Sequence, residues 1–259
     1  MLNALITETK SFDFNKQRYE IFISYNSNHY GYFQPLYFLD ANTQQASMLD
    51  CEISNRNENI LYVGIGYQDG VDINRARTRD YTIPSLGTEF NEGGGAELFY
   101  KFITTCVKPW IESRYLIKKD KQTLAGHSHG GHFVLFTALN HPKEFQNYLA
   151  ASPSIWWGDG KLIPDGKLTL DNEIRKLTIM IGEFEEKLHP KSNDTERAQI
   201  LNMNLNPKLR ARNLAQRLLN NEQCCDFIVC SGRRHPGVIK DYVRIARFIA
   251  ANNPHHTGL

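Results

Sequence analysis

The 259-residue sequence predicts an α/β fold, with a mostly parallel central sheet and helices on both of its faces. Short apolar runs alternate along the chain with segments of helical periodicity, and this order predicts parallel strands joined by right-handed crossovers. Each run is continuously apolar, which is typical of strands that are covered on both sides. The runs cover residues 36–39, 60–65, 123–125, 177–181 and 227–230. An earlier segment, residues 18–25, alternates between polar and apolar side chains and predicts an antiparallel strand at the sheet edge.

Four further segments carry apolar residues at helical spacing. Residues 98–111 do so, although Pro109 lacks a backbone N–H and should bend or divide that helix. Residues 131–139 predict a short apolar helix, while residues 207–219 and 238–250 are amphipathic and predict helices that pack against the sheet.

Two segments lack this periodicity. Residues 159–171 are rich in Gly, Pro and Lys, and residues 188–206 are polar and irregular. We expect both to be surface excursions over the carboxyl edge of the sheet, because ligands of open α/β folds bind at that edge.

The composition narrows the class of protein. With 41% hydrophobic and 22% charged residues, the chain has material for one substantial core, and we expect a single domain spanning residues 1–259. A net charge of +2 gives no electrostatic sign of a nucleic-acid binder, and no run approaches the ~18 apolar residues of a membrane span. The first ten residues lack signal-peptide features, and the five cysteines form no C-x-x-C pair, so we expect a cytoplasmic protein.

The strongest local signal is a G-x-S-x-G motif made of Gly126, Ser128 and Gly130. An apolar strand precedes the motif and a helix follows it, which is the context of a nucleophile elbow. The serine of such an elbow occupies a strained turn, so its neighbours must be small enough to let strand and helix approach. The helix start then faces the negative charge that develops during acyl transfer, and the N–H of His129 becomes one oxyanion donor.

Three histidines surround this serine and raise the alternative of a metal site. His127 and His129 flank Ser128 in a tight turn, so their side chains should diverge, and His132 follows in the helix. No carboxylate or further ligand lies close by in sequence, and we expect neither a metal nor any other cofactor.

Further motifs lie along the chain at residues 36–40, 63–67, 79–84, 93–96, 151–154 and the pair Trp156-Trp157. Together with the elbow, they make the sequence resemble the Putative esterase branch of the α/β-hydrolases, which includes esterase D, feruloyl esterases and enterobactin-type siderophore esterases. The resemblance covers nearly the whole chain, and the R-D-Y-T-x-P stretch and the paired tryptophans are most similar to the siderophore esterases. It implies an α/β-hydrolase fold and a serine esterase activity on a small-molecule ester. From the net charge and the short apolar runs we expect no nucleic-acid or membrane partner.

The other members of a catalytic triad would follow the serine in the order acid, then histidine. His235 lies after the last apolar run and before the last helix, where family members carry their base, although Pro236 interrupts the usual H-G or H-x-G. The resemblance maps the acid to Glu185, at the end of the 177–181 run. Glu183 and Glu186 remain open, as does a dyad without a working acid.

A second oxyanion donor is expected from the loop after the 60–65 run, where Gly66 and Tyr67 are the candidates. Just beyond it, the arginines Arg75, Arg77 and Arg79 would lie on one extended face. Their guanidinium groups could bind a carboxylate or an electron-rich catechol ring, or they could belong to a solvated loop.

Trp156 and Trp157 follow the strand after the elbow and could form the wall of an aromatic pocket. We expect at least one of the two to be buried in the hydrophobic core instead. The sequence therefore predicts a serine esterase, with aromatic or catecholate esters as the preferred substrates. An acyltransferase on the same scaffold and a non-catalytic ligand-binding relative remain as alternatives. The sequence leaves the oligomeric state open.

Overall fold

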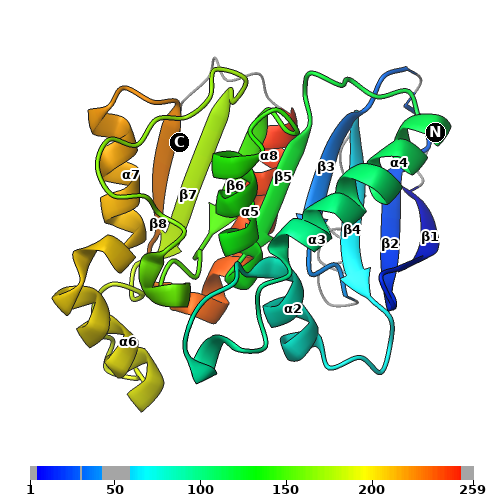
Figure 1. The fold of residues 1–259 in the computed structure, drawn as a ribbon. Helices are drawn as coiled ribbons and strands as arrows, with labels where there is room; N and C mark the ends of the chain where they lie inside the picture. Colours follow the sequence, from blue (N-terminus) through cyan, green and yellow to red (C-terminus); the bar gives the residue numbers. More distant parts are fainter. Residues whose placement is uncertain (1–4, 30, 43–58, 252–259) are drawn as a thin grey trace.

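The computed structural model describes residues 5–29, 31–42 and 59–251. Within these ranges, eight strands form one sheet in the order β1-β2-β4-β3-β5-β6-β7-β8 (Figure 1). β2 pairs antiparallel with β1 and with β4, and all the other pairs are parallel. The strands are β1 (Leu5–Phe14), β2 (Gln17–Asn26), β3 (Gln34–Leu39), β4 (Ile60–Tyr67), β5 (Thr123–His127), β6 (Asn147–Ala151), β7 (Lys176–Gly182) and β8 (Cys225–Cys230).

Helices cover both faces of this sheet (Figure 1). α3, α4, α5 and α7 pack in one hydrophobic cluster, while α8 packs in a second cluster on the other face. The prediction of a mostly parallel sheet between helices is therefore confirmed. The α-helices are α2 (Ile73–Tyr81), α3 (Ala96–Phe102), α4 (Lys108–Arg114), α5 (His129–Asn140), α6 (Asp194–Leu205), α7 (Ala211–Asn220) and α8 (Ile239–Ala251). The short 3-10 helices are η1 (Thr88–Phe90), η3 (Trp157–Gly160), η4 (Pro207–Leu209) and η5 (His235–Val238).

The edge of the sheet differs from the prediction. The predicted early strand is β2, but β1 lies outside it and forms the edge (Figure 1). Asn15 and Lys16 join the two strands with φ values of 46° and 62°, as in a two-residue hairpin turn that matches the strand twist. β1 has no fully buried residue, so its sequence carries little of the hydrophobic signal of a covered strand.

The helix predicted over residues 98–111 is divided, as Pro109 led us to expect. α3 ends at Phe102, a π-helical turn (η2) covers Ile103–Val107, and α4 begins at Lys108. Proline is tolerated in the first turn of a helix because its missing N–H has no acceptor there.

The polar segment 188–206 is not irregular, and this prediction was wrong. It contains α6, whose start is fixed by a capping box in which Asn193 and Glu196 exchange side-chain-to-backbone hydrogen bonds. Ile200 is the buried residue of this helix, so the apolar periodicity that marks most helices is weak here. Within the described ranges, no helix combines the length and the apolar character needed to cross a membrane.

Candidate active site

The turn between β5 and α5 carries Ser128 in a left-handed backbone conformation, with φ 60° and ψ −118°. Glycines make this turn possible. A Cβ on Gly126 would lie 2.4 Å from the carbonyl oxygen of Gly130, and a Cβ on Gly131 would lie 2.7 Å from that of Ala151. The Ser128 N–H donates to the Ala151 carbonyl at 2.9 Å, which ties the turn to the end of β6. Main-chain contacts therefore hold the strained serine in place.

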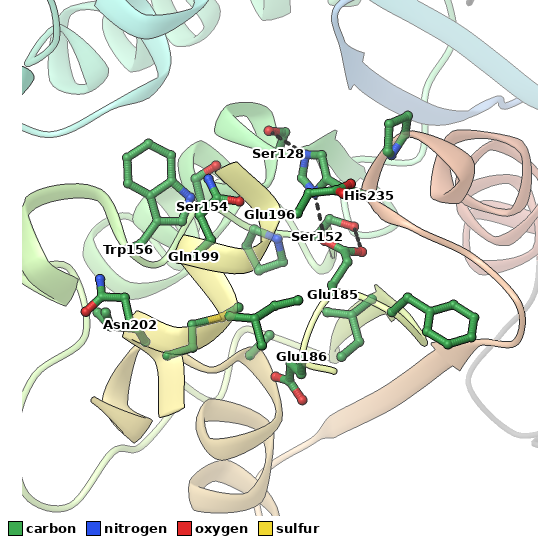
Figure 2. Close-up of a pocket in the computed structure, with 18 of the residues that line it drawn as sticks. Ser128, Ser152, Ser154, Trp156, Glu185, Glu186, Glu196, Gln199, Asn202 and His235 are labelled. Carbon is green, nitrogen blue, oxygen red and sulfur yellow. Dashed lines mark hydrogen bonds and ion pairs between the residues drawn. The ribbon is translucent and has the colours of Figure 1, made fainter. Parts of the chain in front are cut away.

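A continuous hydrogen-bond chain links Ser128, His235 and Glu185, which are brought together from three separate sheet-edge loops (Figure 2). The Ser128 Oγ lies 3.1 Å from His235 Nε2, and His235 Nδ1 lies 2.7 Å from Glu185 Oε2. His235 begins η5 after β8, and Glu185 follows β7. A carboxylate that accepts from Nδ1 fixes the tautomer in which Nε2 can take a proton from the hydroxyl.

The second oxygen of Glu185 is also held, and the residue responsible was not predicted. Ser152 Oγ and the Gly182 N–H each donate to Glu185 Oε1 at 2.6 Å (Figure 2). Ser152 has a positive φ of 44° directly after β6. Its place next to Pro153 was visible in the sequence, but its contact with Glu185 depends on the pairing of β6 with β7.

The neighbouring acids have other partners. Glu183 accepts from Lys187 at 2.6 Å and from the Gly232 N–H at 2.7 Å. Glu186 accepts from the backbone and the guanidinium of Arg212, both at 3.0 Å. Of the three glutamates considered from the sequence, Glu185 is therefore the one hydrogen-bonded to His235.

The three histidines around the turn are electrically neutral at ordinary pH. Desolvation lowers the pKa of His127 and of His129 to about 3, with further lowering by the positive charge of Arg77. Burial likewise lowers the pKa of His132 to about 4. The part of the chain that the structure describes holds no group of three or more His, Cys, Asp or Glu side chains arranged for a metal ion.

His127 and His132 use their ring N–H groups within the fold. A carbonyl oxygen can only accept, so a neutral ring nitrogen beside it must donate. His127 Nε2 thus donates to the His235 carbonyl at 3.2 Å, and His132 Nδ1 donates to the Ser154 carbonyl at 3.0 Å. Both contacts fix loops that surround Ser128.

The candidate oxyanion donors lie in different places. His129 is the first residue of α5, and N–H groups of a first helical turn have no acceptor within the helix. Gly66 and Tyr67 are not in a loop, contrary to the prediction, because β4 continues through Tyr67. β3 separates β4 from β5, so Asp40, which directly follows β3, lies closer to the turn.

The three predicted arginines do not lie on an extended face. They belong to α2, which begins where the Asp72 side chain accepts from the Arg75 N–H. Arg77 pairs with Asp40 at 2.7 Å and also donates to the His127 carbonyl. The prediction failed because a helix turns residues i and i+2 to different sides.

The other two arginines also have acidic partners. Arg75 lies 3.3 Å from Glu92, and Arg79 forms two 2.7 Å hydrogen bonds with Asp80. None of the three lines the cavity that contains Ser128. Within the R-D-Y-T-x-P stretch, Arg79 and Asp80 are therefore engaged with each other.

The two tryptophans separate into a cavity residue and a core residue. Trp156 is 36% exposed and lines the cavity that contains Ser128 (Figure 2). Trp157 is buried, donates its ring N–H to the Ile83 carbonyl at 2.8 Å, and packs against Phe90. Its position explains why Gly93 is glycine, since a Cβ there would lie 2.2 Å from the Trp157 ring.

The cavity has a volume of about 480 Å³ and opens at the carboxyl ends of β5, β6 and β7. Ser128, Glu185 and His235 lie in its wall. α6 closes one side of the cavity. Its lining residues, such as Gln199, Ile200 and Met203, recur at helical spacing. The sequence predicted that this segment lies over the carboxyl edge of the sheet, but it did not predict the helix that forms the wall.

Comparison of the sequence and the structure with known proteins identifies the family of the chain. The model of the family described as Putative esterase matches residues 17–220. The ferri-bacillibactin esterase BesA of Bacillus subtilis is 36% identical over 183 residues, which are 62% of this chain and 63% of the relative. A siderophore triacetylfusarinine C esterase of Aspergillus fumigatus is 30% identical over 138 residues, 50% of this chain and 47% of the relative.

These matches span between about half and just under two thirds of the length of the curated relatives. Among solved structures, the siderophore hydrolase EstB of Aspergillus nidulans superposes with a TM-score of 0.75 over 97% of each chain, at 20% identity. That likeness shows a shared α/β-hydrolase fold, and the family match covers most of the sequence. The chain belongs to the Putative esterase family.

Proposed function

We propose that this chain is a serine esterase that hydrolyses siderophore-type carboxylic esters, with Ser128 as the nucleophile in a nucleophile elbow. The observation that carries the proposal is the hydrogen-bond chain from Glu185 through His235 to Ser128, which ends at a serine in a strained turn beside a cavity. The names of the relatives support an ester substrate of the siderophore type.

In the proposed mechanism, His235 removes the proton from Ser128 while the serine oxygen attacks the ester carbonyl carbon. The resulting oxyanion accepts a hydrogen bond from the His129 N–H at the start of α5, where the helix dipole also favours negative charge. His235 then gives its proton to the departing alcohol, which leaves an acyl group on Ser128. Water, activated by the same histidine, hydrolyses the acyl-enzyme and restores the serine.

A panel of esters tests the substrate class. We expect an iron-free siderophore trilactone to be hydrolysed with a higher kcat/KM than a feruloyl ester or a short p-nitrophenyl acyl ester, measured by product chromatography. A preference for the short acyl ester would remove the siderophore assignment and leave the esterase standing. Transfer of the acyl group to an added alcohol, in place of hydrolysis, would favour an acyltransferase.

The role of Glu185 gives a further prediction. Glu185→Gln is expected to lower kcat/KM by up to about 10⁴-fold, because an amide cannot stabilise the imidazolium and can favour the wrong tautomer. Glu186→Gln is the matched control, since its carboxylate pairs with Arg212 on the neighbouring helix. Steady-state kinetics of both variants check this. Near-normal rates for Glu185→Gln would mean that Ser128 and His235 work as a dyad.

We also propose a cytoplasmic location. Cys106, Cys224, Cys225 and Cys230 are all free thiols, which suits a reducing compartment. Fractionation of the source cells with a specific antibody would test the proposal, and recovery of the protein outside the cytoplasm would overturn it.

A further inference from the structure

The charged side chains in the wall of the Ser128 cavity are all acidic among the residues that the structure describes. No Lys or Arg side chain of those residues lines it. The acidic residues are Glu89, Asp159, Glu185, Glu186 and Glu196. Glu185 belongs to the proposed triad, which leaves Glu89, Asp159, Glu186 and Glu196 as the further acidic residues of the wall.

Two of these acids, Glu186 and Glu196, are paired with guanidinium groups. Arg234 forms a two-point contact with Glu196, and Arg212 lies 3.0 Å from Glu186. A cation held in such a pair attracts an anionic substrate less strongly, because the neighbouring carboxylate cancels much of its charge. The ion pairs of α2, described above, remove the arginines that the sequence had suggested for this purpose.

Glu89 and Asp159 differ from the paired acids. Both are exposed on the wall of the cavity, and neither forms an ion pair with any described residue. Phe90 packs against Trp157 with ring centroids 4.9 Å apart, which holds η1 beside η3. The two free carboxylates therefore come from adjacent segments, and the exposed ring of Trp156 belongs to the same stretch of wall.

The rest of the wall is neutral. Gln199 and Asn202 of α6 offer amide groups, and most of the other lining residues are apolar. In Figure 2, Trp156 and Asn202 lie on one side of the cavity, away from His235 and Glu185. A substrate group that extends from Ser128 toward Trp156 would meet an aromatic face and carboxylates, with neutral amides beside them.

We propose that this cavity selects esters whose bound acyl group carries a protonated amine over esters whose acyl group carries a carboxylate, with Glu89, Asp159 and Trp156 as the selecting residues. An ammonium group gains from both carboxylates and from the aromatic face. A carboxylate in the same place meets two like charges, and no Lys or Arg of the described residues lines the cavity. Because the two acids are exposed, water and salt weaken the effect, and we expect about a tenfold difference in kcat/KM.

The inference rests on the proposed esterase function, and a series of three esters tests it. The p-nitrophenyl esters of 6-aminohexanoate, hexanoate and monoanionic adipate have similar length and differ in terminal charge. Each kcat/KM is divided by the hydroxide-catalysed rate of the same ester. We expect the order ammonium, neutral, carboxylate, with a ratio of about ten or more between the first and the last that shrinks as salt is added.

A charge-removing double variant identifies the residues. Glu89→Gln with Asp159→Asn should bring the ammonium-to-carboxylate ratio toward one. Asp69→Asn with Glu173→Gln is the matched control. It removes two exposed acids that form no ion pair with a described residue and do not line the cavity, so the ratio should not change.

Three results would overturn the inference. Wild-type protein could fail to distinguish the charged esters or could favour the carboxylate, or the preference could survive in the cavity double variant. A different result would be that folded wild-type protein hydrolyses none of the three esters. That result would contradict the esterase proposal itself, and the inference with it.

Discussion

Ser128→Ala is expected to lower kcat/KM for ester hydrolysis on the order of 10⁶-fold, the loss found when the nucleophile of a fully coupled triad is removed. The reason is geometric. The Oγ of Ser128 is the atom 3.1 Å from His235 Nε2, and no other hydroxyl makes that contact among the described residues. The residual rate would reflect the oxyanion donor and substrate binding alone.

The fold should survive this substitution. The contacts that hold the turn come from the main chain, including the bonds of Ser128 to Ala151, Ser154 and His132, and an alanine keeps them. Thermal unfolding measured by circular dichroism checks this. Ser113→Ala, which removes an exposed hydroxyl on α4, is the control and should retain normal turnover. Normal hydrolysis by Ser128→Ala would show that another group is the nucleophile.

His235→Ala is expected to cause a loss of similar size, because the serine proton then has no acceptor in place. The effect should appear mainly in kcat, since the imidazole moves protons in the transition state and contributes little to binding of the ester. Steady-state kinetics and a single-turnover acylation measurement, both on the same ester, would separate these contributions.

A second histidine–carboxylate pair provides the control for this variant. His141 Nε2 lies 2.8 Å from Glu97, but the pair lies outside the Ser128 cavity. His141→Ala should therefore keep near-normal kcat. If His235→Ala retained most of its activity, the proton would have to leave Ser128 by another route, and the proposed mechanism would fail.

Much of the sheet could be predicted from the sequence because its buried strands are short and continuously apolar. β3 and β7, for example, were predicted to within two residues at each end, and both are buried over nearly their whole length. β1 was missed because an edge strand buries few side chains, so its pattern does not stand out.

The candidate triad could be assigned from chain order because each member follows a recognisable strand. The sequence could not decide between Glu183, Glu185 and Glu186, which lie within four residues of one another. That choice depends on which carboxylate points toward the loop after β8, and the structure directs Glu185 there through Ser152 and Gly182. The single-domain organisation stays a prediction.

The predicted substrate and oxyanion residues show where local patterns are insufficient. Gly66 and Tyr67 were assigned to a loop because the apolar run ends at Ile65, whereas β4 continues and β3 lies between it and β5. The order of the strands along the chain does not reveal that β3 and β4 exchange places in the sheet. The side of α2 on which Arg77 lies depends on where that helix begins. Asp72 caps the helix start, and the sequence analysis did not predict a helix there.

The most direct measurement of the central claim is intact-protein mass spectrometry after incubation with a fluorophosphonate, followed by peptide mapping. The reagent forms a stable covalent bond with an activated serine and so stands in for the acyl-enzyme. We predict one adduct per chain, located on Ser128, and no adduct on Ser128→Ala. An unmodified wild-type protein, or an adduct that persists in Ser128→Ala, would contradict the assignment of Ser128 as the nucleophile.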